Sequence, residues 1–105
     1  LDPVAKTELD ALAERMLVNP TLLFEVAVHD DAQGDAAASL KMTQQRADAI
    51  LEHLRSKGVS KERVTAKGYG STRLLNHCAA GVQCTPEEHA ENRRTEYTVT
   101  GRTLK

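Results

Sequence analysis

The sequence is poor in aromatic residues and carries no excess of either charge. Its only aromatic side chains are Phe24, Tyr69 and Tyr97, and its 14 lysines and arginines face 15 aspartates and glutamates. Stacking on bases requires aromatic platforms, and phosphate backbones attract proteins with a positive field. We therefore expect no binding to nucleic acid. No apolar run approaches the roughly 20 residues that span a bilayer, so we expect no transmembrane helix.

The composition that remains is that of one folded domain. Hydrophobic residues make up 40% of the 105 residues and charged residues 28%, which suits a single modest core. We expect one domain over residues 1–105. The chain opens directly with a predicted helix and without a signal peptide, so we expect it to be a piece of a longer protein.

Cys78 and Cys84 are the only cysteines, and Gly81 lies between them. In an oxidising compartment a disulfide between them would close a short loop and stabilise the fold by about 2 kcal/mol in the chain-entropy estimate. The pair favours the periplasm or the cell surface, although two cysteines alone do not decide the compartment.

Three segments have the apolar spacing and the capping residues of helices. The first is capped by Asp2 and ends at Asn19-Pro20, and the second covers residues 36–57 and ends at Gly58. A short third helix follows the capping box Thr85-Pro86-Glu87-Glu88 and runs to about residue 92. The spacing predicts these core positions in the first two helices: Val4, Ala5, Leu9, Leu12, Ala13, Met16 and Leu17, then Leu40, Ala47, Ile50, Leu51 and Leu54.

Three segments read as strands, at residues 21–29, 64–69 and 95–102. The first has apolar residues on both faces, which predicts a central strand that is covered on both sides. The helices and strands alternate along the chain, so we expect an α/β (α+β) sandwich of two layers. Three strands make a thin sheet, and one further strand before residue 1 would complete it.

Two opposite charges flank the start of the second helix, Asp31 in the turn and Arg46 on the helix. Arg46 lies about 40° from Ile50 around the helix, so its stem would pack at the edge of the buried face and its fork would point in a defined direction. Ser39 and Thr43 share its polar stripe. Asp31 would accept from a ligand ammonium and Arg46 would clamp a carboxylate, which makes a receptor for a zwitterion. The alternative is that Asp31 and Arg46 bond to each other, or to nearby backbone, and bind nothing.

Catalytic arrangements are poorly represented. Asp30 and Asp31 are adjacent, so their side chains diverge instead of flanking a substrate. If the two cysteines are bonded to each other, neither offers an activated nucleophile, and the sequence has no phosphate-binding glycine loop. We expect no enzymatic activity and no cofactor.

The motifs resemble those of one family. Residues 28–47, "VHDDAQGDAAASLKMTQQRA", align without a gap to the pattern G-H-T-D-x-x-G-x-x-x-x-N-x-x-L-S-x-x-R-A, and "GYG" at 68–70 and "NRR" at 92–94 match its two later motifs. The chain resembles the OmpA-like C-terminal domain, the peptidoglycan-binding module of Gram-negative outer-membrane proteins and lipoproteins. The resemblance implies a β-α-β-α-β fold with a mixed sheet, the first strand being absent here. It also implies a C-terminal position in a longer envelope protein and a periplasmic location at the outer membrane.

The resemblance also implies a ligand and the residues that hold it. Family members bind the peptidoglycan stem peptide non-covalently through meso-diaminopimelate, whose side chain ends in an ammonium and a carboxylate. Asp31 matches the family's ligand-binding aspartate and Arg46 its ligand-binding arginine. Asn92 and Arg93 fall on a motif near the site and would support it. The alternative for Asn92 is structural, as a tie between the last helix and neighbouring loops.

Departures from the pattern leave a second function open. Asp30 replaces the usual threonine, Ser39 the usual asparagine and Thr43 a serine. Asp30 would strengthen ammonium binding or compete with Asp31 for Arg46, and Ser39 is a shorter donor that would need a water to reach the ligand. The same fold could therefore serve as a structural or interaction module for other envelope proteins, with peptidoglycan binding lost.

The segment with the cysteines also has two interpretations. The compartment that the family implies favours a disulfide between Cys78 and Cys84, with no metal. The rival is a zinc site of His77, Cys78, Cys84 and His89, which have suitable ligand types but no C-x-x-C knuckle.

Overall fold

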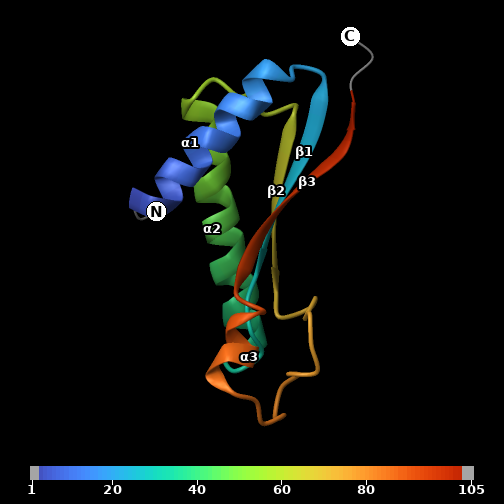
Figure 1. Ribbon diagram of the computed structural model, residues 1–105. Coiled ribbons are helices and arrows are strands. Elements are labelled where there is room, and N and C mark those ends of the chain that lie inside the picture. Colours follow the sequence, from blue (N-terminus) through green and yellow to red (C-terminus); the bar gives the residue numbers. More distant parts are fainter. Residues whose placement is uncertain (1–2, 103–105) are drawn as a thin grey trace.

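A computed structural model describes residues 3–102 of the chain. Helices and strands alternate in the predicted order (Figure 1). The predicted N-cap Asp2 lies outside the described residues. The elements are α1 (Pro3–Val18), β1 (Leu22–His29), α2 (Ala36–Ser56), β2 (Val64–Gly70), α3 (Pro86–Ala90) and β3 (Arg94–Arg102).

The three described strands form one mixed sheet in the order β2-β1-β3. β1 pairs with β2 in parallel and with β3 antiparallel, so the predicted central position of β1 is confirmed. The helices α1 and α2 lie on one face of the sheet (Figure 1), which confirms the two-layer α/β architecture. β1 is also covered on its second face, as predicted, because Ala27 and His29 are buried there. On its second face the buried His29 is stacked on the side chain of Tyr69, with ring centroids 5.2 Å apart.

The core between the two helices and the sheet follows the predicted spacing in most places. Val4, Leu17 and Leu40 are exceptions, because their side chains are largely exposed. Near the start of α2 the buried positions are instead taken by Ser39 and Thr43. The core is made of Leu9, Ala13, Met16, Phe24, Val26, Val28, Ala47, Ile50, Leu54, Val59 and Val64.

A close approach between α2 and β2 explains why small residues are buried there. A Cβ added to Gly68 would lie 2.6 Å from Gln44 Cα and closer still to backbone atoms of Thr43 and Gln44. Two hydrogen bonds span this contact, since Gly68 N donates to Gln44 Oε1 (2.9 Å) and Gly70 N donates to Thr43 Oγ1 (3.0 Å). β2 is at the edge of the described sheet, so side chains of α2 satisfy backbone donors that an edge strand would leave unpaired.

The ends of α2 and α3 carry the caps that the sequence predicted. Asp35 accepts from Ala38 N at the start of α2, and Gly58 follows its end with a φ of 97°, in the left-handed region that favours glycine. In α3 the capping box is complete, because Thr85 Oγ1 accepts from Glu88 N and Glu88 Oε1 accepts from Thr85 N. These local signals fix where the helices start and stop.

The contact at Gly68 generates the first prediction. Gly68→Ala should lower the free energy of unfolding by about 3 kcal/mol or more, because α2 and β2 must separate to admit one methyl group. Gly34→Ala is the matched control, since a Cβ at Gly34 meets no atom within 4 Å; it should change stability by less than about 1 kcal/mol. Urea unfolding of both variants measures the difference. Equal stability of the two variants would show that the contact is not tight.

Candidate functional site

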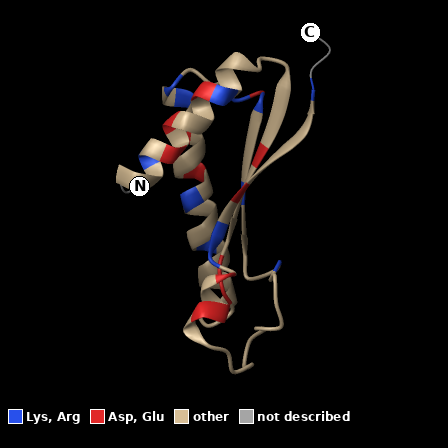
Figure 2. Cartoon of the chain, viewed as in Figure 1, with Lys and Arg blue, Asp and Glu red and all other residues tan. Residues whose placement is uncertain are grey.

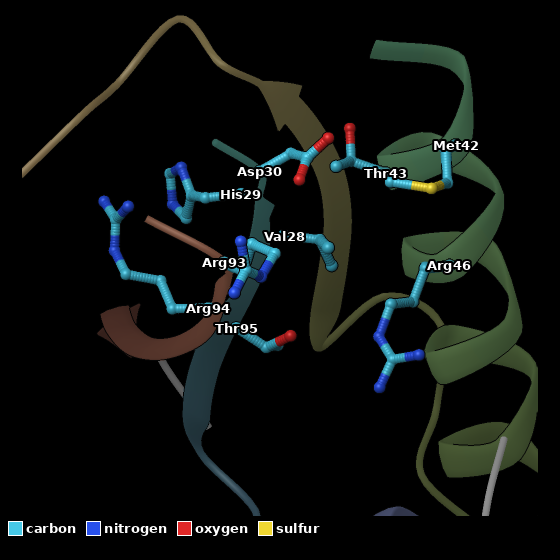
Figure 3. A pocket seen from close by; sticks show the side chains of 9 residues that line it. All are labelled: Val28, His29, Asp30, Met42, Thr43, Arg46, Arg93, Arg94 and Thr95. Carbon is cyan, nitrogen blue, oxygen red and sulfur yellow. The ribbon is translucent and has the colours of Figure 1, made fainter. Parts of the chain in front are cut away.

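A cleft of about 380 Å³ opens where the end of β1, the middle of α2 and the start of β3 meet (Figure 3). Of the residues expected at the site, four line the cleft and three do not: Asp30, Thr43, Arg46 and Arg93 line it, and Asp31, Ser39 and Asn92 do not. The full lining is Val28, His29, Asp30, Met42, Thr43, Arg46, Arg93, Arg94 and Thr95. Three arginines and one aspartate therefore share this lining with the apolar side chains of Val28 and Met42.

Arg46 is the arginine of the cleft with an unpaired guanidinium. It projects from α2 (Figure 3), and no residue between 3 and 102 makes a hydrogen bond or ion pair with it. It also lines a second hollow of about 210 Å³ beside Glu8 and Tyr97. A planar guanidinium with five free donors matches a carboxylate in a bidentate pair. The expected position of Arg46 at the edge of the buried face of α2 agrees with the structure.

The acidic turn after β1 has its carboxylates held by hydrogen bonds. Asp30 Oδ2 accepts from Ser39 Oγ (2.6 Å), and Asp30 Oδ1 accepts from the backbone N of Asp31 (2.9 Å). The Ser39 hydroxyl is therefore committed to Asp30 and orients that carboxylate. Asp30 does not compete with Asp31 for Arg46, because neither acid is bonded to Arg46.

Asp31 is buried and is paired with Arg93, which follows α3. Its carboxylate accepts from Arg93 Nη1, and from Gln33 through both the backbone N (3.0 Å) and the side-chain Nε2 (3.1 Å). Burial alone would raise the pKa of the Asp31 carboxyl, but the hydrogen bonds from Arg93 and Gln33 outweigh it and lower that pKa below its ordinary value. The alternative that Asp31 bonds to Arg46 is wrong for this structure, and Arg93 takes that place.

Thr43 and Asn92 have structural partners. The Thr43 hydroxyl donates to Leu40 O and accepts from Gly70 N, so it joins α2 to β2. Asn92 is fully buried; its Oδ1 accepts from Leu75 N (2.8 Å) and its Nδ2 donates to Asn76 Oδ1 (2.9 Å). The structural interpretation of Asn92, as a tie between the last helix and a neighbouring loop, is confirmed.

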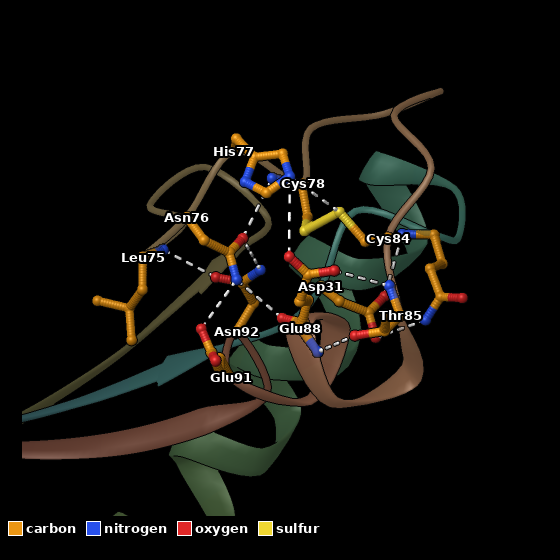
Figure 4. The surroundings of a disulfide bond; sticks show 11 residues. Asp31, Leu75, Asn76, His77, Cys78, Cys84, Thr85, Glu88, Glu91 and Asn92 are labelled. Carbon is orange, nitrogen blue, oxygen red and sulfur yellow. Dashed lines mark hydrogen bonds and ion pairs between the residues drawn. A yellow bond between two sulfur atoms is a disulfide. The ribbon is translucent and has the colours of Figure 1, made fainter.

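Cys78 and Cys84 form the predicted disulfide (Figure 4). The rival zinc site of free cysteines is wrong for this state, because the two sulfurs are bonded to each other. His77 and Glu88 are the titratable side chains beside the sulfurs, and His89, the expected fourth ligand, is not in that group.

Five residues that line the cleft were not predicted as site residues, and Val28 and His29 at the end of β1 are two of them. Arg94 and Thr95 line it from the start of β3, and Met42 lines it from α2. Arg94 was within the "NRR" motif, which is the signal that could have identified it. Arg94 is itself engaged, since it donates to Glu96 Oε2 (3.2 Å) and to the backbone O of Arg73 (3.1 Å).

Comparison with known proteins identifies the family. The sequence model of the OmpA family matches residues 1–93. The chain belongs to the OmpA family. Outer membrane porin F of Pseudomonas fluorescens is 36% identical over 97 residues, which cover 92% of this chain and 28% of that protein. The peptidoglycan-associated lipoprotein of Legionella pneumophila is 30% identical over 89 residues, which cover 85% of this chain and 48% of that protein.

A solved structure shows the same fold. The crystal structure of the peptidoglycan-associated lipoprotein from Burkholderia pseudomallei superposes with a TM-score of 0.77 at 20% identity, covering 93% of this chain and 80% of that one. This OmpA-like chain spans less than half the length of each of the two curated relatives. Within residues 3–102, no helix is long and apolar enough to cross a membrane. Acidic and basic residues are interspersed along α1 and α2 (Figure 2).

The pairing of Asp31 with Arg93 predicts a pH dependence. A carboxyl whose pKa is lower in the folded chain stabilises the fold above its unfolded pKa of about 3.9, and this contribution is lost as the pH falls through the lower folded value. Asp31→Asn should therefore lower the free energy of unfolding by about 1–2 kcal/mol at neutral pH. A larger loss is not expected, because Arg93 is half exposed and solvent screens the ion pair. The difference from the wild-type protein should shrink as the pH drops below 4.

Asp35→Asn is the control for this pH dependence. It changes another carboxylate of the same region, but asparagine caps a helix about as well as aspartate. Urea unfolding of the three proteins between pH 7 and about 2.5 gives the comparison. An Asp31→Asn deficit that stays constant across this range would show that the ionised carboxylate does not contribute.

Proposed function

We propose that this OmpA-like domain binds peptidoglycan non-covalently and tethers its parent protein to the cell wall in the periplasm. The ligand is the meso-diaminopimelate of the stem peptide, with its carboxylate on Arg46 and its ammonium on Asp31. One observation carries the proposal: the guanidinium of Arg46, unpaired among the described residues, lines a cleft whose wall also holds Asp30, the neighbour of Asp31 in the acidic turn. Two opposite charges at one cleft suit a zwitterionic group.

Binding at Asp31 requires an exchange of cations. In the free protein, Arg93 forms an ion pair with the Asp31 carboxylate. The side chain of Arg93 is about half exposed (48%), whereas that of Asp31 is 9% exposed. A ligand ammonium can take over the place of Arg93 without leaving a buried charge unpaired. Asp30 is already in the wall of the cleft, where its carboxylate adds negative charge beside the same ammonium. Ser39 does not bind the ligand directly in this arrangement. It orients the Asp30 carboxylate through its hydrogen bond.

The relatives and the chemistry of the cleft support a binding role without catalysis. Two of the proteins compared above are named as peptidoglycan-associated lipoproteins. The acids of the turn are engaged in hydrogen bonds to neighbouring side chains, and the cysteines are bonded to each other. Ion-pair recognition of this kind is reversible, and many copies on one polymer would raise the overall avidity.

The test compares two muropeptides by isothermal titration calorimetry. One carries meso-diaminopimelate and the other carries lysine, which has the same ammonium but lacks the side-chain carboxylate. The wild-type domain should prefer the diaminopimelate peptide. Arg46→Ala should weaken binding of that peptide by about 10- to 100-fold, because it removes a charge-assisted bidentate pair, and should abolish the preference. Asp31→Asn should weaken both peptides, since both offer the ammonium.

Arg55→Ala provides the matched control for lost positive charge. Arg55 also lies on α2, and its charge pairs with Glu52 away from the cleft; its removal should leave both affinities unchanged. Equal affinity of wild-type protein for the two muropeptides would remove Arg46 from the role assigned to it. Absence of binding to both would favour the alternative function, an OmpA-like module that contacts other envelope proteins.

A further inference from the structure

Four possible metal ligands converge at the disulfide loop (Figure 4). They are His77, Cys78, Cys84 and Glu88, and their ligand atoms all lie within 4.8 Å of one another. His77 Nε2 is 3.8 Å from Cys84 Sγ and 3.8 Å from Glu88 Oε2. In a tetrahedral zinc site, bonds of about 2.0–2.3 Å place neighbouring ligand atoms roughly 3.3–3.8 Å apart. The histidine is therefore already near the spacing that such a site requires.

Contacts other than the disulfide hold this arrangement. His77 and Cys78 are adjacent in a three-residue turn, in which Ala79 N donates to His77 O (2.9 Å). This turn allows both side chains to point toward the same metal position. Cys78 N donates to Asn76 Oδ1 (3.1 Å), and Asn76 is anchored to the buried Asn92. The loop is thus tied to α3 and the start of β3 by backbone and amide hydrogen bonds that do not involve sulfur.

The capping box of α3 presents the carboxylate. Glu88 uses Oε1 to accept from Thr85 N (2.9 Å), which leaves Oε2 facing His77. An outer hydrogen bond that fixes the orientation of a ligand is a usual feature of metal sites.

We propose that this loop is a redox-gated site for Zn²⁺. In the oxidised protein the sulfurs are bonded to each other and offer no thiolate. A dithiol reductant supplies two electrons and two protons: the bond between Cys78 and Cys84 breaks, two thiols form, and the reductant becomes a disulfide. On zinc binding the two thiols release their protons to solvent, and two thiolates, the His77 imidazole and the Glu88 carboxylate complete four ligands.

The ligand set selects the class of metal. Two thiolates and an imidazole favour Zn²⁺ over Mg²⁺ and Ca²⁺, which prefer oxygen ligands. The side chains of His77 (68% exposed) and Glu88 (37% exposed) leave the site open to solvent, so a metal can enter. The group of four ligands includes neither Arg46 nor an acid of the turn, and its test does not depend on peptidoglycan binding.

The experiment titrates Co²⁺, then Zn²⁺, into the whole chain after reduction with a dithiol and removal of the reductant under anaerobic conditions. The reduced protein should bind one Co²⁺ with thiolate charge-transfer bands and the visible spectrum of tetrahedral coordination, and Zn²⁺ should displace it. The oxidised protein should show neither spectrum. Far-UV circular dichroism before metal addition should show that the reduced chain stays folded.

Variants separate this site from binding by any free thiol. His77→Ala should weaken zinc binding by at least the roughly 10- to 100-fold that loss of an outer-shell partner costs. Glu88→Gln should also weaken it by about tenfold or more, while the capping box survives, because glutamine serves in that motif. His53→Ala, a histidine of α2 that pairs with Asp10, is the control and should bind zinc as the wild-type chain does.

Several results would overturn the proposal. Octahedral Co²⁺ spectra, equal zinc affinity in the His77→Ala variant, or zinc binding by a Cys78→Ser/Cys84→Ser double variant would each show that this ligand set does not form. A reduced chain that remains folded but takes up no metal would do the same. So would a chain that unfolds on reduction and is not refolded by zinc, because the loop must then depend on the disulfide.

Discussion

The contact between α2 and β2 determines where the groups that α2 contributes to the cleft lie. Gly68 has no room for a Cβ, and the backbone donors of Gly68 and Gly70 are satisfied by Gln44 and Thr43 of the helix. The close approach at Gly68 fixes the distance between α2 and β2. The two hydrogen bonds also fix the rotation of α2 about its own axis, because the side chains of Thr43 and Gln44 must both face β2. With Thr43 turned to the sheet, Arg46 is placed about one turn further on, at the edge where α2 faces the start of β3.

The charges around the cleft are paired unequally, and burial explains the difference. Asp31 is almost inaccessible to water, so an unpaired carboxylate there would be costly, and Arg93 and Gln33 satisfy it. Arg46 is exposed and is solvated by water, so it can remain without a protein partner. A ligand carboxylate therefore meets a guanidinium that has no pair to break. The ligand ammonium, by contrast, replaces an existing cation, so selectivity for a zwitterion depends on both events.

The sequence predicted most of the fold because most of its signals are local. Helix boundaries rest on caps such as Asp35, Gly58 and the Thr85 capping box, which act within a few residues. Leu40 was wrongly placed in the core because periodicity cannot reveal that Gly68 and Gly70 bring the strand against the helix at that point. Cover on both faces of β1 was predicted, but what covers the second face was not, because part of it is shielded by a side chain of the sheet itself, Tyr69 on His29.

The residues of the site were easier to predict from the sequence than the ion pairs between them. Asp31, Arg46 and Arg93 were all named from the sequence, but Asp31 and Arg93 are 62 positions apart. Either arginine could have reached the carboxylate, and only the path of the chain through α3 decides between them. The disulfide was easier, because a short loop brings Cys78 and Cys84 together whatever the rest of the chain does.

Asn92 links the two ends of this path. Its amide is fully buried and is hydrogen-bonded to Leu75 and Asn76, just before the disulfide loop. Because Arg93 is the next residue in the chain, Asn92 links that loop to Arg93. A buried amide with two satisfied partners resists displacement, because breaking either bond leaves a polar group without water. The position of Arg93 on Asp31 thus depends on the packing of a loop that is distant in sequence from the acidic turn. The cleft is consequently shaped from both sides, by α2 through Gly68 and by the disulfide loop through Asn92.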